Sequence, residues 1–208
     1  MEFKHALPRL RIVQREEYLL AKCQGRRVLH LGAVDHYKGE VCGLHKRLMK
    51  VADYVAGIDI DKNGIEQAML AGIRDIHYGD LEKLGEMNVS DQFDVILAGE
   101  VIEHLSNPGL FLEGVKRFID PQVEMIITTP NVFSLHRYVL TLGRLEYIHP
   151  DHVCYYSLVT LRHLVKRHGF IINEELAYVL EGRFRNLRKL LSRISISFAN
   201  GLILVVRT

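Results

Sequence analysis

The sequence contains no tryptophan and only three cysteines in 208 residues. Cys23, Cys42 and Cys154 are far apart and form no Cys-x-x-Cys pair, so neither a disulfide framework nor a zinc knuckle is expected. A reducing, cytoplasmic compartment is the simplest expectation for such a chain. No apolar run is long enough to cross a bilayer, and the first eight residues lack the apolar centre of a signal peptide.

An excess of one charge is also missing. The 27 Lys and Arg residues nearly balance the 25 Asp and Glu residues, which leaves a formal net charge of +2. This balance gives no case, at the level of the whole chain, for a protein that coats nucleic acid or a membrane surface. The hydrophobic share of 48% is that of a globular protein, and residues 1–208 suit one domain.

Two nucleotide-binding motifs are absent. No Gly-x-x-x-x-Gly-Lys-Ser/Thr occurs, which excludes a P-loop. The first strand-to-helix turn reads Leu-Gly-Ala-Val-Asp-His, and Gly32 is its only glycine, whereas a dinucleotide site needs Gly-x-Gly-x-x-Gly for the close approach of a pyrophosphate. A nicotinamide-dependent enzyme is therefore a disfavoured alternative.

Short apolar runs alternate with helical patterns, which predicts an α/β fold. We expect a doubly wound, Rossmann-like, seven-stranded, mostly parallel sheet with one antiparallel edge strand. The expected strands are 26–31, 54–60, 74–78, 93–98, 123–129, 170–176 and 202–207, and the expected helices are 9–24, 39–50, 63–71, 107–119, 158–168 and 183–196. Three segments stand out from this frame: an N-terminal helical segment (1–24), an irregular lid insertion (131–156) and a basic helical segment (183–197).

Acidic residues follow the strands of this sheet. Asp59 ends the second strand, Asp80 follows the third and Glu100 follows the fourth. Ligands of doubly wound sheets bind at the carboxyl ends of the strands, where a carboxylate such as Asp59 can accept ribose hydroxyls. A ring of acids repels phosphate but suits a cationic sulfonium attached to a ribose.

The order of motifs resembles the class I S-adenosylmethionine-dependent methyltransferases, in particular the ubiquinone-type O-methyltransferases and the methyltransferase type 11 and 23 group. The resemblance rests on residues 28–33, 57–61, 79–81, 93–105, 129–131 and 168–170. It implies S-adenosylmethionine as the cofactor. The cofactor-binding residues that it implies are His30, Gly32, Ala33, Asp59, Ile60, Asp80, Leu81, Gly99 and Glu100. His30 replaces the acid that is usual in the first motif, and Val34 and His36 stand where glycines are common. The altered glycine motif keeps a catalytically weak, cofactor-binding partner subunit as an alternative.

A possible metal site follows the fourth strand. Glu100, Glu103 and His104 are spaced i, i+3 and i+4, so a helical turn would place them on one face. With His152 from the lid, they could bind Mg²⁺ or Mn²⁺. The ubiquinone-type enzymes are similar at the first three positions, and the small-RNA 2′-O-methyltransferases are similar near His152 as well. Without metal, His104 or His152 could act as a catalytic general base, and a structural role for His104 beside the Pro130–Asn131 turn stays open.

The acceptor is expected to be a small molecule, a glycan or a lipid-linked sugar that is methylated on oxygen. No Asn/Asp-Pro-Pro-Tyr motif follows the fourth strand, which weakly disfavours methylation of nitrogen. RNA 2′-O-methylation is the alternative; the modest net charge and the lack of a recognisable RNA-binding module weigh against a nucleic-acid partner. The sequence indicates no oligomeric state.

Overall fold

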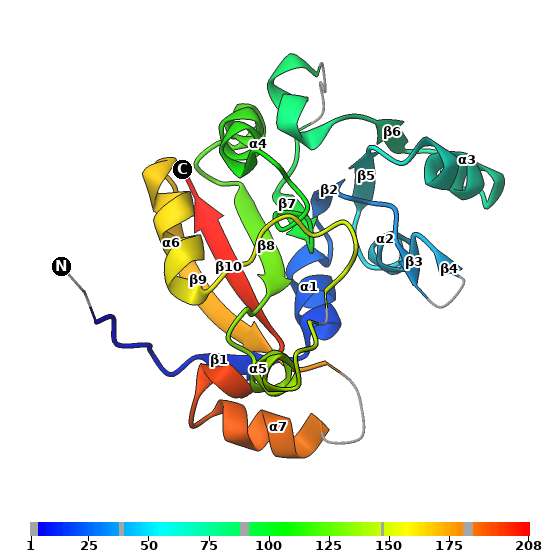
Figure 1. The fold of residues 1–208 in the computed structure, drawn as a ribbon. Coiled ribbons are helices and arrows are strands. Elements are labelled where there is room, and N and C mark those ends of the chain that lie inside the picture. Colours follow the sequence, from blue (N-terminus) through cyan, green and yellow to red (C-terminus); the bar gives the residue numbers. More distant parts are fainter. Residues whose placement is uncertain (1–3, 38–39, 88–91, 147, 181–184) are drawn as a thin grey trace.

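The computed structural model describes residues 4–37, 40–87, 92–146, 148–180 and 185–208 (Figure 1). The strands are β1 (Arg11–Val13), β2 (Arg27–Leu31), β3 (His36–Tyr37), β4 (Glu40–Val41), β5 (Tyr54–Asp59), β6 (Ile76–Tyr78), β7 (Val95–Gly99), β8 (Glu124–Pro130), β9 (Ile171–Tyr178) and β10 (Gly201–Arg207). The helices are α1 (Arg15–Cys23), α2 (Gly43–Leu48), α3 (Lys62–Leu70), α4 (Pro108–Val115), α5 (Leu135–Leu142), α6 (Leu158–Arg167) and α7 (Arg185–Ser192). Short 3₁₀ helices are η1 (Leu81–Glu86), η2 (Lys116–Phe118) and η3 (Ile196–Phe198). Among these described helices, none is long and apolar enough to span a membrane.

One large sheet with the strand order β1-β9-β10-β8-β7-β2-β5-β6 forms the centre of the fold. Strand β10 is antiparallel to both of its neighbours, β8 and β9, and the other pairs of the sheet are parallel. The chain runs outward from β2 to β5 and β6, and then returns to β7 on the other side of β2. The carboxyl ends of β2 and β7 therefore lie side by side at the switch point, where such sheets bind ligands.

Both faces of this sheet are buried, and successive apolar residues of one strand pack on opposite faces. In β2, Leu29 belongs to the apolar cluster that includes residues of α4 and α6, whereas its neighbour Val28 belongs to the cluster that includes residues of α1 and α2. Both residues are fully buried. Because successive side chains of a strand point to opposite faces, a run of consecutive apolar residues predicts a strand that is covered by helices on both sides. Figure 1 shows these two helical layers around the sheet.

The expected fold class is confirmed, but the main sheet has eight strands rather than seven. The additional strand is β1, which pairs in parallel with the end of β9, with Arg11 opposite Leu176. The expected helix at 9–24 was too long for this reason: it begins only at Arg15. The pairing partner lies more than 160 residues away, so local periodicity gives no signal for it. The antiparallel strand is β10, and β9 and β1 extend the sheet beyond it.

Two other helices also differ from expectation. The described part of segment 39–50 begins with β4, which pairs with β3 in a small hairpin, and only then continues as α2. Cys42 connects them with a left-handed backbone, at φ 58°. Within the basic segment, α7 begins at Arg185, and residues 183 and 184 lie outside the described residues.

The segment at 131–156, expected to be irregular, contains helix α5. Leu135, Tyr138, Val139 and Leu142 are spaced i, i+3, i+4 and i+7, which is a helical pattern. No residue of α5 is buried, so the helix extends from the sheet without joining the core.

Candidate cofactor and acceptor site

The turn after β2 requires the glycine that the sequence retains. Gly32 has φ 68°, a left-handed conformation that other residues rarely adopt. A Cβ atom at Gly32 would lie 2.5 Å from Cγ2 of Val101, which follows β7. The Gly32 amide donates a hydrogen bond of 2.9 Å to the Ile58 carbonyl at the end of β5. The turn is thus held between the ends of β5 and β7, and Ala33 behind it is fully buried.

Asp59 fastens this turn to β5. One carboxylate oxygen accepts the Val34 amide at 2.8 Å, and the other accepts the Asp61 amide at 2.9 Å. Asp59 is 7% exposed, and burial raises its pKa, while the two backbone amides oppose that rise. The carboxylate is therefore not a solvated acid at a helix start. It is held in a fixed orientation, and each of its oxygens keeps a second lone pair for a ligand.

Asp80 and Leu81 follow β6 at the edge of the sheet where β5 also ends. Asp80 caps η1 by accepting the Glu82 amide at 2.9 Å, and Leu81 is buried under it. Ile60, directly after Asp59, is instead 61% exposed. This part of the rim therefore combines an exposed aliphatic side chain with the carboxylates of Asp59 and Asp61 on either side of it in the sequence.

Glu100 lies at the centre of a polar network beyond β7. Its Oε1 accepts hydrogen bonds from the hydroxyls of Thr128 at 2.9 Å and of Tyr178 at 2.8 Å. Arg15 of α1 donates to the Thr128 hydroxyl at 3.0 Å and forms an ion pair with Glu100 at 3.7 Å. The Glu100 backbone is left-handed at φ 59°, a conformation that costs a non-glycine residue of the order of 1–3 kcal/mol. This network joins α1, β7, β8 and β9.

Glu103 does not join His104 in the group of described side chains that could hold one ion. Residues 101–104 form a turn rather than an α-helix, so the spacing i, i+3 and i+4 does not align these side chains. Glu103 is 1% exposed, and neither of its carboxylate oxygens makes a hydrogen bond. Burial, and secondly the negative charge of Glu100, raise the pKa of Glu103 well above its usual range.

The lid brings two histidines to His104. The backbone amides of Val153 and Cys154 both donate to the Glu103 carbonyl, at 3.0 and 3.1 Å, and so fasten the lid to the loop after β7. The ring of His104 meets that of His152 edge-on, with 4.5 Å between centroids. His149 joins them, and one nitrogen of each ring lies within 4.8 Å of the other two.

The three rings are electrostatically coupled. Burial, followed by the neighbouring His149, lowers the pKa of His104. Burial, followed by His104 and His149, lowers the pKa of His152 to about 4. His104 and His152 are therefore neutral at neutral pH, and neutral imidazole is the form that accepts a proton or binds a metal ion.

His30 lies deeper than its expected place on the rim. It is 2% exposed, and its Nδ1 lies 3.3 Å from Nδ1 of His45 on α2, with the two rings stacked. Burial is the main cause that lowers the pKa of His30 well below its usual range and that of His45 to about 4. This neutral pair packs beneath the rim, where the family that the chain resembles usually has an acid.

The structure thus brings together only part of the expected metal set. His104 and His152 come together with His149. Glu100 instead bonds the hydroxyls of Thr128 and Tyr178, and Glu103 is buried outside the histidine cluster. Sequence reasoning missed Arg15 and Tyr178, which contact Glu100 from the first helix and from β9. No motif marks these two residues, because only the folded sheet brings them to the end of β7.

Comparisons with known proteins identify the family of this chain. A family model described as a methyltransferase domain matches residues 5–175. A ubiquinone biosynthesis O-methyltransferase of Azorhizobium caulinodans is 30% identical over 137 residues, which are 62% of this chain and 49% of that protein. A Mycolicibacterium smegmatis protein named "Probable S-adenosylmethionine-dependent methyltransferase" is 28% identical over 159 residues, 76% of this chain and 57% of that protein. The chain spans about half the length of these curated relatives.

Two solved structures share the fold. An S-adenosylmethionine-dependent methyltransferase from Archaeoglobus fulgidus superposes with a TM-score of 0.62 at 15% identity, covering 93% of this chain and 94% of that chain. The small RNA methyltransferase HEN1 superposes with a TM-score of 0.66 at 19% identity, covering 93% of this chain and 24% of that chain. The fold is that of the class I S-adenosylmethionine-dependent methyltransferases. Because the family model matches most of its length, this chain belongs to the methyltransferase domain family.

Proposed function

We propose that this chain transfers a methyl group from S-adenosylmethionine to a hydroxyl oxygen of a small molecule, a glycan or a lipid-linked sugar. The observation that carries the proposal is the histidine cluster of His104, His149 and His152, which the lid fastens beside the carboxyl ends of β7 and β8. The name of the Azorhizobium caulinodans relative supports oxygen as the methylated atom.

The residues of the rim fit the cofactor. Gly32 keeps the first turn free of a side chain, and Asp59 presents fixed carboxylate oxygens that suit ribose hydroxyls. The backbone of Gly99 lies close to the guanidinium of Arg15. A Cβ atom at position 99 would be 2.8 Å from Nη2 of Arg15, so a side chain does not fit at this position. S-adenosylmethionine supplies a methyl group on a positively charged sulfur, which an oxygen nucleophile takes up by direct displacement.

The protein has few chemical tasks in such a reaction. It must align the acceptor hydroxyl, exclude water and remove one proton. The neutral imidazole of His104, with His152 against it, can accept that proton directly from the acceptor hydroxyl. At the end of the lid, the side chains of Tyr156 and Cys154 donate hydrogen bonds to backbone carbonyls of the loop after β7.

The first experiment is calorimetric titration of the protein with S-adenosylmethionine and S-adenosylhomocysteine. We expect dissociation constants in the micromolar range, which corresponds to about −8 kcal/mol. Binding of NAD in preference to both would support the nicotinamide alternative. Absence of binding to either sulfur compound would contradict the proposed function, and tight binding with no methylated product would favour the partner-subunit alternative.

His104→Ala is expected to spare cofactor binding and to lower turnover by about 10²–10⁴-fold, because the proton acceptor is lost. The measurement is transfer of a labelled methyl group to a panel of phenols, sugars and short RNAs, with calorimetry as the binding control. His77→Ala, at an exposed histidine of β6, is the matched control. Unchanged turnover in the His104 variant would remove His104 from the mechanism.

A metal ion is the second candidate role of the cluster. Three imidazoles suit Zn²⁺, Co²⁺ or Ni²⁺ better than the Mg²⁺ or Mn²⁺ that the expected carboxylates would favour. The nitrogens, within 4.8 Å of one another, need only a small inward movement to reach bonding distance around one ion. When bound, such an ion would hold the acceptor hydroxyl and lower its pKa.

Titration with Co²⁺ tests this role through the visible absorption of the ion. His149→Ala is expected to weaken binding at least about tenfold, whereas Glu100→Gln should leave binding unchanged because Glu100 lies outside the cluster. If Glu100→Gln abolishes binding and His149→Ala does not, the carboxylate set expected from the sequence is the correct one. If no ion binds, His104 acts without metal.

A further inference from the structure

Helix α5 presents an apolar face that the rest of the described protein does not cover. Leu135 is 41% exposed, Tyr138 60%, Val139 55% and Leu142 70%, and these four residues lie on one side of the helix. Phe133 before the helix and Leu145 after it are 63% and 61% exposed. Single exposed apolar residues are common, but a contiguous group marks an interaction site.

Helix α7 repeats this pattern. Leu187 is 53% exposed and Leu190 57%, at the spacing i and i+3 on the helix, and Ile194, in the turn after the helix, is 74% exposed. The helix otherwise consists largely of cationic and polar residues, and only Ser192 of its described residues is buried. A helix with a narrow apolar stripe, a basic polar face and little overall hydrophobicity is typical of helices that lie in a membrane interface.

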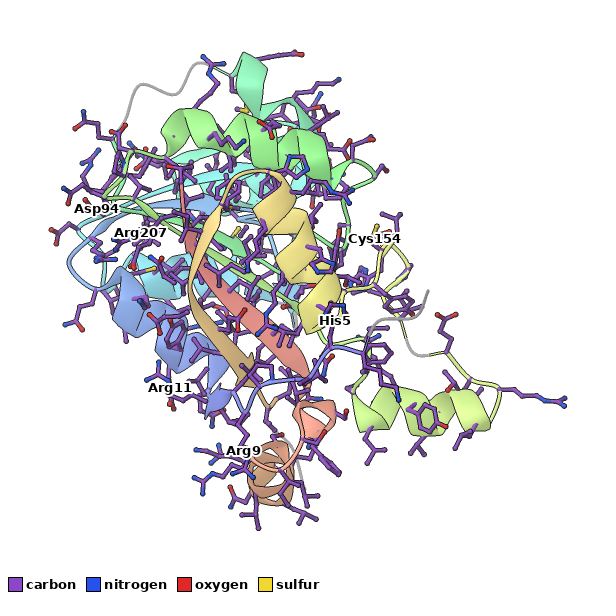
Figure 2. All side chains as sticks on the ribbon, turned by 90° about the vertical axis from the view of Figure 1, so that its left-hand side faces the viewer. His5, Arg9, Arg11, Asp94, Cys154 and Arg207 are labelled. Carbon is purple, nitrogen blue, oxygen red and sulfur yellow. The ribbon has the colours of Figure 1, made fainter. Side chains whose placement is uncertain are left out.

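The two helices lie at the same end of the molecule. Both are at the lower end of the fold in Figure 1 and Figure 2, and η3 contacts both. The N-terminal residues 7–10 lie at the same end of the molecule, since residues 7–10 and residues 192–196 at the end of α7 line one pocket. Figure 2 shows Arg9 beside α7. We call this end, with residues 7–10, 133–145 and 185–196, the α5–α7 surface.

Positive charge accumulates on the α5–α7 surface. Its cationic residues are Arg9, Arg137, Arg144, Arg185, Arg188, Lys189 and Arg193, and these ranges contain no Asp or Glu. The nearest acid along the lid is Glu146, which accepts a hydrogen bond from the hydroxyl of Tyr155. The whole chain has a net charge of only +2, so the charge of this surface is local.

We propose that the α5–α7 surface docks on the surface of an anionic lipid bilayer. The apolar side chains of α5 and α7 would enter the boundary between head groups and acyl chains, and the surrounding cations would pair with lipid phosphates. Both features are needed for this partner. RNA would bind the cations and leave the apolar side chains exposed. A surface that binds another protein would more often carry acidic residues among its cations.

The surface adjoins the candidate acceptor site. Helix α5 belongs to the same lid whose later residues, His149 and His152, contact His104. Docking through α5 would therefore hold the lid at the lipid surface, where an acceptor with a lipid tail could reach the histidine cluster without leaving the bilayer. Docking itself needs no methyl transfer, so it is tested separately from the proposed function.

The experiment is sedimentation of the full chain with vesicles. One set contains equal parts of phosphatidylglycerol and phosphatidylcholine, and the other contains phosphatidylcholine alone. We expect binding to the anionic vesicles, at least about tenfold stronger than to the neutral ones and weakened by salt. Absence of binding to the anionic vesicles, or equal binding to both sets, would overturn the proposal.

Matched variants test the two components. Leu187→Ser/Leu190→Ser/Ile194→Ser removes apolar contact, and Lys189→Glu/Arg193→Glu reverses charge; each is expected to weaken vesicle binding at least about tenfold. The controls are Met69→Ser/Leu70→Ser on α3, at residues 51% and 89% exposed, and Lys166→Glu/Arg167→Glu on α6. Arg188 is left unchanged because it bonds Asn200 and the Leu180 carbonyl. Equal losses in the controls would contradict a localised surface.

Other occupants give different results. A second copy of the chain would appear as a dimer in light scattering that the serine triple variant dissociates. An RNA partner would bind a short labelled RNA in a manner sensitive to Lys189→Glu/Arg193→Glu and insensitive to the serine variant. Either result, obtained together with loss of the preference for anionic vesicles, would replace the bilayer as the partner.

Discussion

Asp59→Ala is expected to lower the affinity for S-adenosylmethionine by more than about 100-fold. A carboxylate that accepts two ribose hydroxyls contributes two charge-assisted hydrogen bonds, each worth about 1.5–3 kcal/mol. The affinity is measured by calorimetric titration against the unchanged protein. An affinity within threefold of the original would show that the ribose does not bind at Asp59.

The same substitution is expected to lower the free energy of unfolding by about 1–3 kcal/mol. The reason is that Asp59 holds the amides of Val34 and Asp61, at 2.8 and 2.9 Å, in addition to its proposed ligand. Binding must therefore be measured under conditions in which the variant is fully folded, as checked by circular dichroism.

Asp35→Ala provides the matched control. Asp35 lies in the same turn and accepts one backbone amide, that of Leu44 at 3.2 Å, but it does not end a strand of the large sheet. This variant should lose stability to a similar or smaller degree and keep its affinity for the cofactor. If both variants lose affinity equally, the effect of Asp59 is due to the shape of the turn rather than to contact with ribose.

The stability of the protein is expected to fall steeply as the pH falls from about 6.5 towards 4. The buried pair of His30 and His45 stays neutral in the folded state, since burial lowers the pKa of His45 to about 4 and that of His30 well below its usual range. Unfolded histidines bind protons below about pH 6.5, so acid favours the unfolded state over this interval. Above pH 6.5 neither state is protonated at these residues, and the pair gives no pH dependence.

The expected size of this effect is large. One pKa unit corresponds to about 1.4 kcal/mol, so His45 alone accounts for a loss of about 3 kcal/mol between pH 6.5 and 4. His30 adds to the loss in the same direction. His104 and His152 also have lowered pKa values and contribute to the slope, so the contribution of the pair must be isolated by substitution.

The substitution His45→Gln isolates the contribution of the buried histidine pair to the pH dependence of stability. Glutamine does not titrate, so the variant should lose less stability between pH 6.5 and 4.5 than the unchanged protein. The chain has no tryptophan, and urea unfolding is therefore followed by far-ultraviolet circular dichroism at several pH values. His77→Gln, at an exposed histidine, should keep the original slope. An unchanged slope in His45→Gln would show that this buried histidine is not the source of acid sensitivity.

Local patterns were enough to predict most elements of the fold. The apolar run around Val28 and Leu29 predicted β2, and the expected helices at 63–71 and 158–168 lie close to the observed bounds of α3 and α6. Strand ends could be predicted because a change from apolar to acidic residues, as at Asp59, accompanies the emergence of a strand from the core.

Predictions that depended on a single assumed local conformation were less accurate. The metal set assumed that residues 100–104 form a helical turn. They form a turn that begins with a left-handed Glu100, and Glu103 is consequently buried. The helix at 9–24 assumed that apolar spacing continues through Arg11, where pairing with β9 produces a strand instead.

The sequence by itself determined the order of βα units, the retained Gly32 and the acids at the strand ends, and hence the family, because these features depend on neighbours a few residues apart. Only the tertiary structure decided which side chains meet. Arg15 with Glu100, His30 with His45, and His104 with the lid histidines are joined by packing between distant segments. The physical reason is that backbone periodicity is local, whereas burial, charge pairing and the pKa of a side chain depend on every segment that packs around it.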